Sequence, residues 1–194
     1  MAEQTNHATY KRGSRVRAAR HSWALRWIDP HFTHRPGRYV GQALLAALVL
    51  GTVLFAEEGL TNGAIVVAIA GSVAVVFFVP HSLASAPGRI IGGHIFAVIA
   101  AYVSFGLFLL LPVAAGSPPG WAIHVTAATS VGLVLLFMTI TNTEHSPAAG
   151  TALGLATRAV PDGVPGDAVL FIITAAILIA AVRVILGKRL HNLI

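Results

Sequence analysis

The sequence predicts an all-α, polytopic membrane protein: a helical bundle of five full spans plus one short or broken helix, preceded by a basic cytoplasmic tail. Of the 194 residues, 56% are hydrophobic and 10% are charged, whereas about 25% of a soluble domain is charged. Apolar runs of about 20 residues recur between Gly, Pro and polar breaks, as in helices that cross a bilayer. A very hydrophobic soluble bundle is the alternative. The absence of cysteine excludes disulfides and thiolate-bound metals.

The positive charge is concentrated before the first apolar run. Residues 1–38 hold eight of the 13 Lys and Arg residues and two acidic residues, and the remainder is neutral overall. By the positive-inside rule this predicts a multi-pass protein of the cell membrane with a cytoplasmic N-terminus. The tail also suits anionic lipid, but no nucleic-acid motif accompanies it, so no nucleic-acid partner is expected. Trp23 and Trp27, with Arg20 and Arg26, predict an interfacial amphipathic segment that ends at Asp29-Pro30.

The chain thus divides into a basic tail, 1–38, and a transmembrane domain, 39–190. Full spans are expected at 39–56, 64–79, 90–111, 121–140 and 168–186. A further helix over 147–159 would rise only about 20 Å, short of the ~30 Å hydrocarbon core. It is rich in Ala and Gly, which favours close packing inside a bundle. It either crosses or re-enters; crossing would place the C-terminal Lys188 and Arg189 on the cytoplasmic side, as the positive-inside rule prefers.

The most informative stretch is 143–154, Thr-Glu-His-Ser-Pro-Ala-Ala-Gly-Thr-Ala-Leu-Gly. Ser146 is a good N-cap and Pro147 a good first helical residue. A helix beginning here would aim free backbone N–H groups and its positive dipole end toward Glu144 and His145, which is a suitable site for an anion. The alternative is that Ser-Pro simply starts the next helix after a tight loop.

A similar break, His81-Ser82-Leu83-Ala84, follows the second apolar run. The likeness of the two breaks is either chance or an internal repeat, and transporters often build central sites from paired broken helices. His94 follows two glycines that permit close approach, and is either a site residue or a packing histidine. The predicted substrate-binding residues are His81, Ser82, His94, Glu144, His145, Ser146, Pro147 and Ala148. An anion path is expected to include Arg89, Arg158 and Thr143, although Arg158 is equally suited to anchoring a helix at the interface.

A metal site is the main chemical alternative. His81, His94, His145 and Glu144 are residue types that bind Zn²⁺, which would suit a membrane-embedded metal-binding protein or metal-dependent enzyme. No H-x-x-x-H or H-E-x-x-H spacing occurs in the chain. We therefore expect no metal, no other cofactor and no enzymatic activity. A partner-binding protein that uses its basic tail is a third possibility.

Several motifs together resemble the HPP family of integral membrane proteins. They are Trp27-Ile28-Asp29-Pro30, Val79-Pro80-His81-Ser82, Ile91-Gly92-Gly93-His94 and the long motif over 141–154, within a resemblance that covers about residues 27–190. The resemblance implies four to six transmembrane helices and no soluble catalytic domain.

Family members in plastids and cyanobacteria are linked to nitrite transport, so the resemblance implies a small inorganic anion as partner, nitrite first and nitrate next, carried by a channel or a transporter. The chain departs from the family at Ser146, where the His-Pro-Pro motif has its first proline. The small-residue helix faces also lead us to expect a homo-oligomer in the lipid bilayer.

Overall fold

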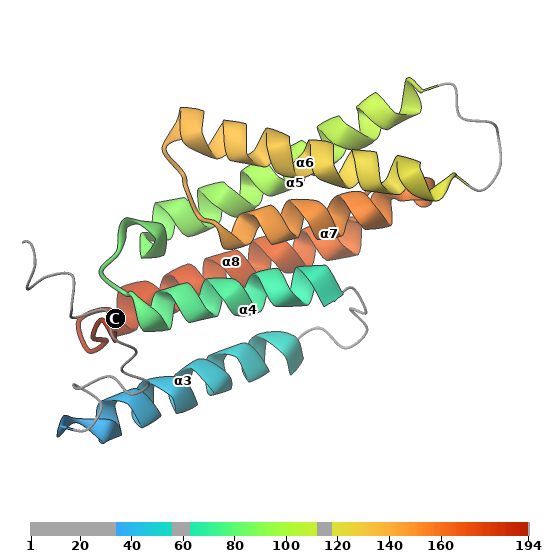
Figure 1. Ribbon diagram of the computed structural model, residues 1–194. Helices are drawn as coiled ribbons and strands as arrows, with labels where there is room; N and C mark the ends of the chain where they lie inside the picture. The colour runs from blue at the N-terminus through green and yellow to red at the C-terminus, as the bar shows by residue number, and fades with distance from the viewer. Residues whose placement is uncertain (1–33, 56–62, 112–117, 194) are drawn as a thin grey trace, which may run out of the picture. The chain divides into compact units, whose positions relative to one another are not determined.

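The computed structural model describes residues 34–55, 63–111 and 118–193, and these residues are almost entirely helical (Figure 1). No strand occurs among them. The chain divides into two compact units, 1–39 and 40–194; in the first, residues 34–39 are described and contain the start of α3. The helices are α3 (Pro36–Phe55), α4 (Gly63–Phe78), the 3-10 turn η1 (Leu83–Ser85), α5 (Pro87–Leu109), α6 (Gly120–Thr141), α7 (Pro147–Asp162) and α8 (Gly166–Leu186).

Four of these helices, α3, α5, α6 and α8, are long and apolar enough to cross a membrane. The predicted all-helical membrane architecture is therefore confirmed. The helix α4 occupies the position of the second predicted span, but its 16 residues rise only about 24 Å, so five full spans remain a prediction. The tail 1–20, the interfacial segment that ends at Asp29-Pro30 and the acidic turn at Glu57-Glu58 lie outside the described residues.

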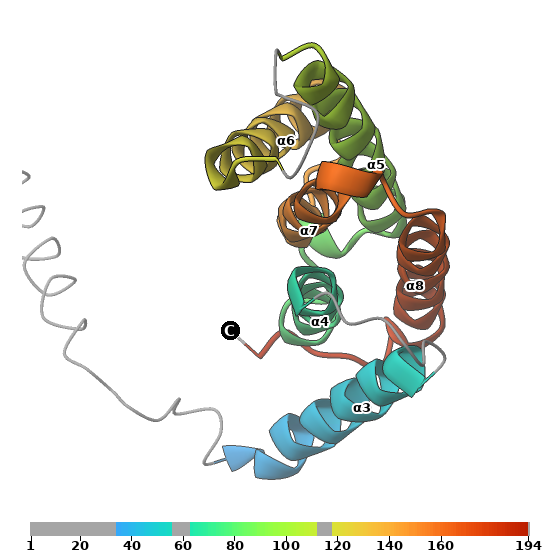
Figure 2. The same ribbon diagram turned by 90° about the vertical axis from the view of Figure 1, so that its right-hand side faces the viewer.

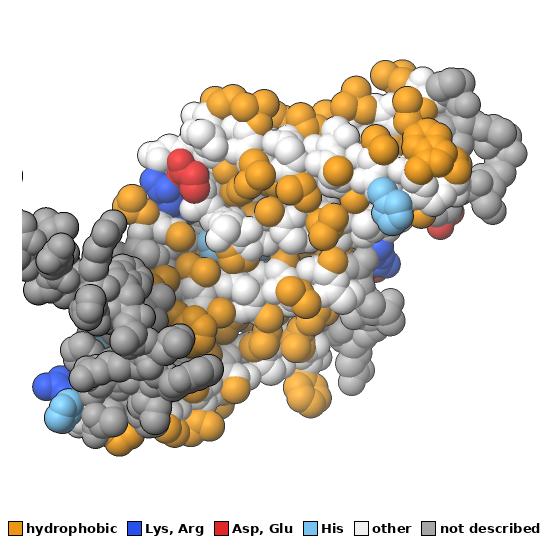
Figure 3. Space-filling view, viewed as in Figure 1, with side chains coloured by type: hydrophobic (Ala, Val, Ile, Leu, Met, Phe, Trp, Pro, Cys, Tyr) orange, Lys and Arg blue, Asp and Glu red, His pale blue; other side chains and the backbone are white. Residues whose placement is uncertain are grey.

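The surface of the described helices is strongly apolar. Figure 3 shows hydrophobic side chains spread over the visible face rather than gathered in one patch. Soluble monomers rarely expose so many large apolar groups, so this surface fits contact with lipid. The most exposed of them include Leu44, Leu48, Leu110, Ile140, Leu170, Val184 and Ile185.

The short helix α7 packs against α4, α5 and α6, and makes fewer contacts with α8 (Figure 2). A Cβ added at Gly154 would lie 2.8 Å from Ile65 Cγ1, and one added at Gly150 would lie 3.1 Å from Ala68 Cβ. Two glycines spaced four apart thus allow α7 to approach α4 closely, as in membrane helix pairs. The backbone leaves helical geometry at Val160 (φ −99°, ψ 113°), so the regular helix ends where the sequence predicts.

Two apolar clusters surround this arrangement. The larger joins residues of α3, α4, α5 and α8, including Val53, Phe77, Ile90 and Ile172. The smaller joins α5, α6 and α7 and is built from Ala97, Ala100, Val134, Met138, Ala148 and Ala152. Its many alanines bring the three helices close together, and this closeness positions the polar groups described next.

Candidate functional site

The segment 142–146 connects α6 to α7 by a sharp turn. Asn142 adopts the left-handed conformation (φ 56°, ψ 41°), and its backbone N–H donates to the Met138 carbonyl oxygen. The Thr143 N–H donates to the same oxygen at 2.9 Å. Asparagine tolerates this conformation better than most residues, so the sequence locally favours ending α6 here. The turn directs His145 into the protein interior, where its side chain is fully buried.

The N-terminus of α7 differs from the expectation. Ser146 is itself helical (φ −53°, ψ −34°) and, among the described residues, its side chain makes no capping hydrogen bond. The Ala148 N–H donates to the His145 carbonyl oxygen at 2.9 Å, and the Ala149 N–H to the Ser146 carbonyl oxygen at 3.1 Å. Ser146 thus occupies the N-cap position and Pro147 begins the helix, as predicted, but the Ser146 side chain does not cap the helix, and the Ala148 and Ala149 N–H groups are not free for an anion. Turn-type hydrogen bonds satisfy those donors instead.

Two histidines converge on one serine beneath this turn. His94 on α5 and His145 are both 0% exposed, and their ring centroids are 5.4 Å apart. The Ser72 hydroxyl on α4 lies between them, 3.0 Å from His94 Nε2 and 2.9 Å from His145 Nε2. Three separate elements thus contribute one buried polar cluster to the protein interior.

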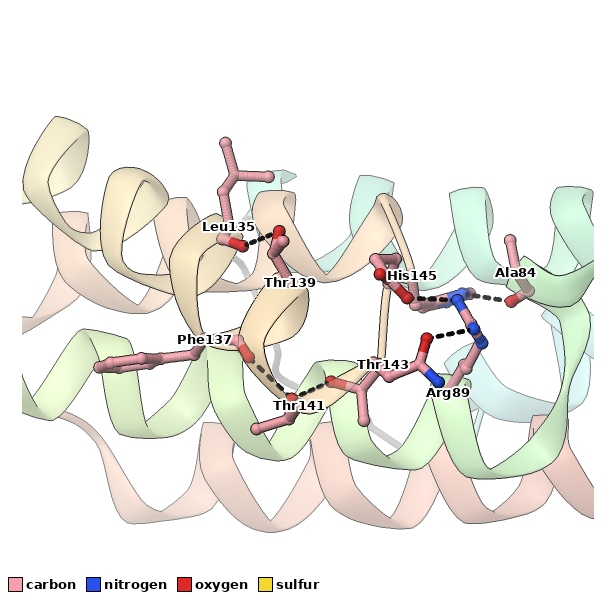
Figure 4. A network of polar contacts seen from close by, with 10 residues as sticks. Ala84, Arg89, Leu135, Phe137, Thr139, Thr141, Thr143 and His145 are labelled. Carbon is pink, nitrogen blue, oxygen red and sulfur yellow. Dashed lines mark hydrogen bonds and ion pairs between the residues drawn. The ribbon is translucent and has the colours of Figure 1, made fainter.

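The outer nitrogen of each ring is also paired. His94 Nδ1 lies 3.0 Å from the Thr151 hydroxyl of α7. His145 Nδ1 lies 2.9 Å from the carbonyl oxygen of Ala84 in η1 (Figure 4). The two chain breaks that look alike in the sequence therefore meet through this hydrogen bond. Burial lowers the pKa of His145, an effect that the Ala84 hydrogen bond opposes; the ring is accordingly neutral at neutral pH.

Glycines on α5 make this convergence sterically possible. A Cβ added at Gly93 would lie 2.9 Å from His145 Cβ and 3.3 Å from Ala148 Cβ. One added at Gly92 would lie 2.7 Å from Thr143 Cγ2. The expectation that the glycines before His94 permit close approach is therefore confirmed.

Arg89 binds the same turn at its exposed side. Its guanidinium forms an ion pair with Glu144 and donates to Asn142 Oδ1 at 2.6 Å. The Glu144 side chain is 48% exposed and that of Arg89 is 17% exposed. Nearby, the Thr143 hydroxyl lies 2.8 Å from that of Thr141 (Figure 4). Arg89 and Thr143 of the predicted anion path thus lie at the α6–α7 turn.

The other predicted residues are placed elsewhere. His81 pairs with the C-terminal segment: its N–H donates to Asn192 Oδ1 at 3.2 Å, and its Nε2 lies 3.2 Å from the Leu190 carbonyl oxygen. The Ser82 hydroxyl lies 3.0 Å from that of Ser85. Neither residue is hydrogen-bonded to the His94–His145 cluster, so the two breaks do not contribute equivalent residues.

Three further predicted residues lie on α7 or at its start. Ser146 is exposed, and Pro147 packs toward Gly71, where an added Cβ would lie 3.4 Å from Pro147 Cβ. Arg158 lies about 16 Å further along the helix axis than Pro147. Its Nη1 is buried and has no hydrogen-bond partner among the described residues.

The geometry of the described residues does not support the metal-site alternative. No group of three or more His, Cys, Asp or Glu side chains within 34–55, 63–111 and 118–193 is arranged to hold a metal ion. His81 is engaged with the C-terminal segment and Glu144 with Arg89. The proposed ligand set of His81, His94, His145 and Glu144 therefore does not assemble.

Sequence reasoning missed Ser72 and Thr151. Ser72 carries the only polar side chain in α4, and isolated polar groups in apolar spans are often functional; that signal was available. Thr151 lies within the informative 143–154 stretch. The rotation of α7 that turns this hydroxyl toward His94 is a property of helix packing.

These features define an integral membrane helical bundle with a buried histidine–hydroxyl cluster at a helix break. A family model described as "HPP, transmembrane region" matches residues 33–193. The chain belongs to the HPP family, and the resemblance seen in its motifs is confirmed. No match was found among curated proteins or among solved structures.

Proposed function

We propose that this protein transports a small inorganic anion across the membrane, with nitrite as the first candidate and nitrate as the second. The observation that carries the proposal is the convergence of two imidazoles and two hydroxyls, all buried, inside an apolar bundle. Polar groups at such depth are costly and typically mark substrate or ion pathways. Membership of a transmembrane family is consistent with this function.

The anion would be held by side-chain donors, which can rotate from one acceptor to another, rather than by the α7 N-terminus, whose first N–H groups are held in backbone hydrogen bonds. Imidazole N–H and hydroxyl groups can donate to nitrite oxygens. His94 and His145 would bind the anion with Ser72 and Thr151, and Ala148 packs beside them. Arg89 would attract the anion at the exposed side of the α6–α7 turn, where the anion and Glu144 would compete for the guanidinium.

The test is anion flux into proteoliposomes containing purified protein, comparing nitrite, nitrate, formate and chloride. We expect His94→Ala and His145→Ala each to reduce nitrite flux by about tenfold or more. Each substitution removes a hydrogen-bond donor and leaves the buried polar groups bonded to that imidazole without a partner. The matched control is His124→Ala, since His124 is an exposed histidine at the start of α6. Absence of flux for all four anions in folded, inserted protein would overturn the proposal, as would equal loss in the control.

A further inference from the structure

We propose that His145, Ser72, His94 and Thr151 form a proton-transfer chain, so that each transported anion crosses together with one proton. The coupling to an anion rests on the proposed function; the proton chain itself rests on hydrogen-bond geometry. The chain extends from η1 through α4 and α5 to α7, with successive donor–acceptor distances of 2.9, 2.9, 3.0 and 3.0 Å.

The neutral chain has one direction that satisfies every group. A carbonyl oxygen only accepts, so His145 Nδ1, which faces the Ala84 oxygen, must carry hydrogen. His145 Nε2 then accepts from the Ser72 hydroxyl. Ser72 in turn accepts from His94 Nε2–H, and His94 Nδ1 accepts from the Thr151 hydroxyl. Both tautomers are thereby fixed by the surroundings.

The same atoms accommodate one added proton without any large movement. The Ser72 hydroxyl also lies 3.0 Å from the carbonyl oxygen of Ala68, one turn earlier on α4. When His145 carries hydrogen on both nitrogens, Nε2–H donates to Ser72, and the Ser72 hydroxyl turns to donate to Ala68. His94 Nε2–H still donates to the second lone pair of Ser72. A rotation of one hydroxyl therefore separates two fully bonded states.

Transfer along the chain balances simply. A proton delivered to the Thr151 hydroxyl forms a new O–H bond there as the original Thr151 O–H bond breaks and an N–H bond forms on His94 Nδ1. The His94 Nε2–H bond then breaks as an O–H bond forms on Ser72, and the original Ser72 O–H bond breaks as an N–H bond forms on His145 Nε2. No electrons are exchanged, and the positive charge passes from Thr151 to His145.

The pair should bind one proton rather than two, because two cations with centroids 5.4 Å apart would repel each other strongly. The titratable residues on the surrounding elements are few: α4 and η1 have none, and no described carboxylate hydrogen-bonds to either ring. Arg89 on α5 is engaged by Glu144. The others are His81 before η1, Tyr102 on α5, His124 on α6, Arg158 and Asp162 on α7, and Asp167 and Arg183 on α8.

A bound proton offsets the charge of a transported anion at the point where an unpaired charge costs most. An anion that moves with one proton transfers no net charge. Flux should therefore respond to a pH gradient and not to a membrane potential. This separates the proposal from an anion channel, whose flux follows the potential.

The experiment measures nitrite flux and internal pH together in proteoliposomes, with and without a potassium diffusion potential, and with protein-free vesicles as background. We expect one proton per nitrite and no response to the potential. Ser72→Ala should lower the number of protons taken up per nitrite from one toward zero, because it removes the bridge and leaves both histidines in place. The ratio is the readout because Ser72 also lines the proposed anion site, so that nitrite flux alone can fall in this variant. The matched control is Ser130→Ala, a buried serine on α6 that donates to the Ala152 carbonyl oxygen and lies outside the chain. If Ser72→Ala does not fold, Ser72→Cys, a weaker donor, replaces it.

The outcomes separate the two proposals. Nitrite flux that follows the potential and carries no proton would overturn the coupling and leave anion transport standing. Wild-type coupling that survives in Ser72→Ala would overturn the chain. If no anion moves, transport fails, and the chain is tested alone by ¹⁵N NMR of the histidines in full-length protein in lipid nanodiscs.

At neutral pH the NMR spectra should place hydrogen on His145 Nδ1 and on His94 Nε2, with assignments from His94→Gln and His145→Gln. Acidification should add one proton to the pair. Two independent titrations, or a different pair of tautomers, would overturn the chain irrespective of the substrate.

Discussion

At the scale of single residues, the buried histidines are tolerated because every ring nitrogen has a partner. A buried polar group without a partner costs about 1–3 kcal/mol, whereas a paired one is close to neutral. His145 is also the residue that links the α6–α7 turn to η1, through the Ala84 carbonyl oxygen. Its chemistry and its structural role are therefore inseparable.

The lowered pKa of His145 predicts an acid-sensitive fold. In the unfolded chain this imidazole binds a proton near its ordinary pKa of 6.5, but the folded protein resists protonation until lower pH. The unfolded state then binds more protons, so stability is full above pH 6.5 and falls as the pH drops below it. Thermal unfolding in one detergent from pH 8 to about pH 5 should show this decline.

The decline should be shallower in His145→Gln and unchanged in His124→Gln, whose side chain is exposed. A pH profile of His145→Gln that parallels the wild type would show that another group is responsible.

A pair of substitutions on α7 distinguishes its two hydroxyl residues. Ser146→Ala should change the free energy of unfolding by less than about 0.5 kcal/mol, because Ser146 is exposed and its side chain does not cap the helix. Thr151→Val should cost about 1–3 kcal/mol, because it leaves His94 Nδ1 without a partner. Thermal or denaturant unfolding under identical conditions measures both. A cost for Ser146→Ala as large as the ~1 kcal/mol of a typical N-cap would contradict the observed geometry.

At the scale of elements, α7 is the helix on which the others are arranged. Its glycines and alanines bring it within contact of α4, α5 and α6. Polar side chains of α4, α5 and α7 therefore lie close together between apolar helices. The same closeness that packs α7 also aligns Thr151 with His94 and His145 with Ser72. The close packing of α7 and the assembly of the buried polar cluster therefore both follow from the small side chains of this helix.

This closeness is tested by adding one methyl group. Gly154→Ala should destabilise the protein by about 1–3 kcal/mol, because the new Cβ would lie 2.8 Å from Ile65 Cγ1 and 3.0 Å from the Ile65 backbone nitrogen. Gly132→Ala in α6 is the matched control, since nothing lies within 4 Å of its added Cβ. It should be neutral or stabilising by about 0.5–1 kcal/mol, because alanine favours the helix. Equal unfolding midpoints for the two variants would refute the close α4–α7 contact.

At the scale of the whole molecule, the four long helices and the shorter α4 and α7 leave the number of crossings as the central question. We predict six crossing segments, with both termini on the cytoplasmic side. The chain contains no cysteine, so a single introduced cysteine reports its own location without background. Thr5→Cys and Lys188→Cys should both react with a membrane-impermeant maleimide only after the cytoplasmic side is opened. Labelling from opposite sides would mean that one of the two short helices does not cross.

The sequence alone determined the elements. Apolar runs and their Gly, Pro and polar breaks predict the helices within a few residues, because hydrophobicity and helix termination are local properties. It also identified His94, His145 and the 143–154 stretch, since polar groups within apolar runs are conspicuous. Family membership followed from the same motifs, because they are contiguous in the chain.

Only the tertiary structure decided which of these residues meet. The repeated His-Ser pattern suggested equivalent roles for His81 and His145, yet one contacts the C-terminal segment and the other the buried serine. Ser72 joined the site although it is 73 residues distant from His145 in the chain. The physical reason is that the contact depends on how each helix is rotated and how closely it approaches its neighbours. Rotation and approach are set by packing between glycines and alanines across the bundle, which no single segment encodes.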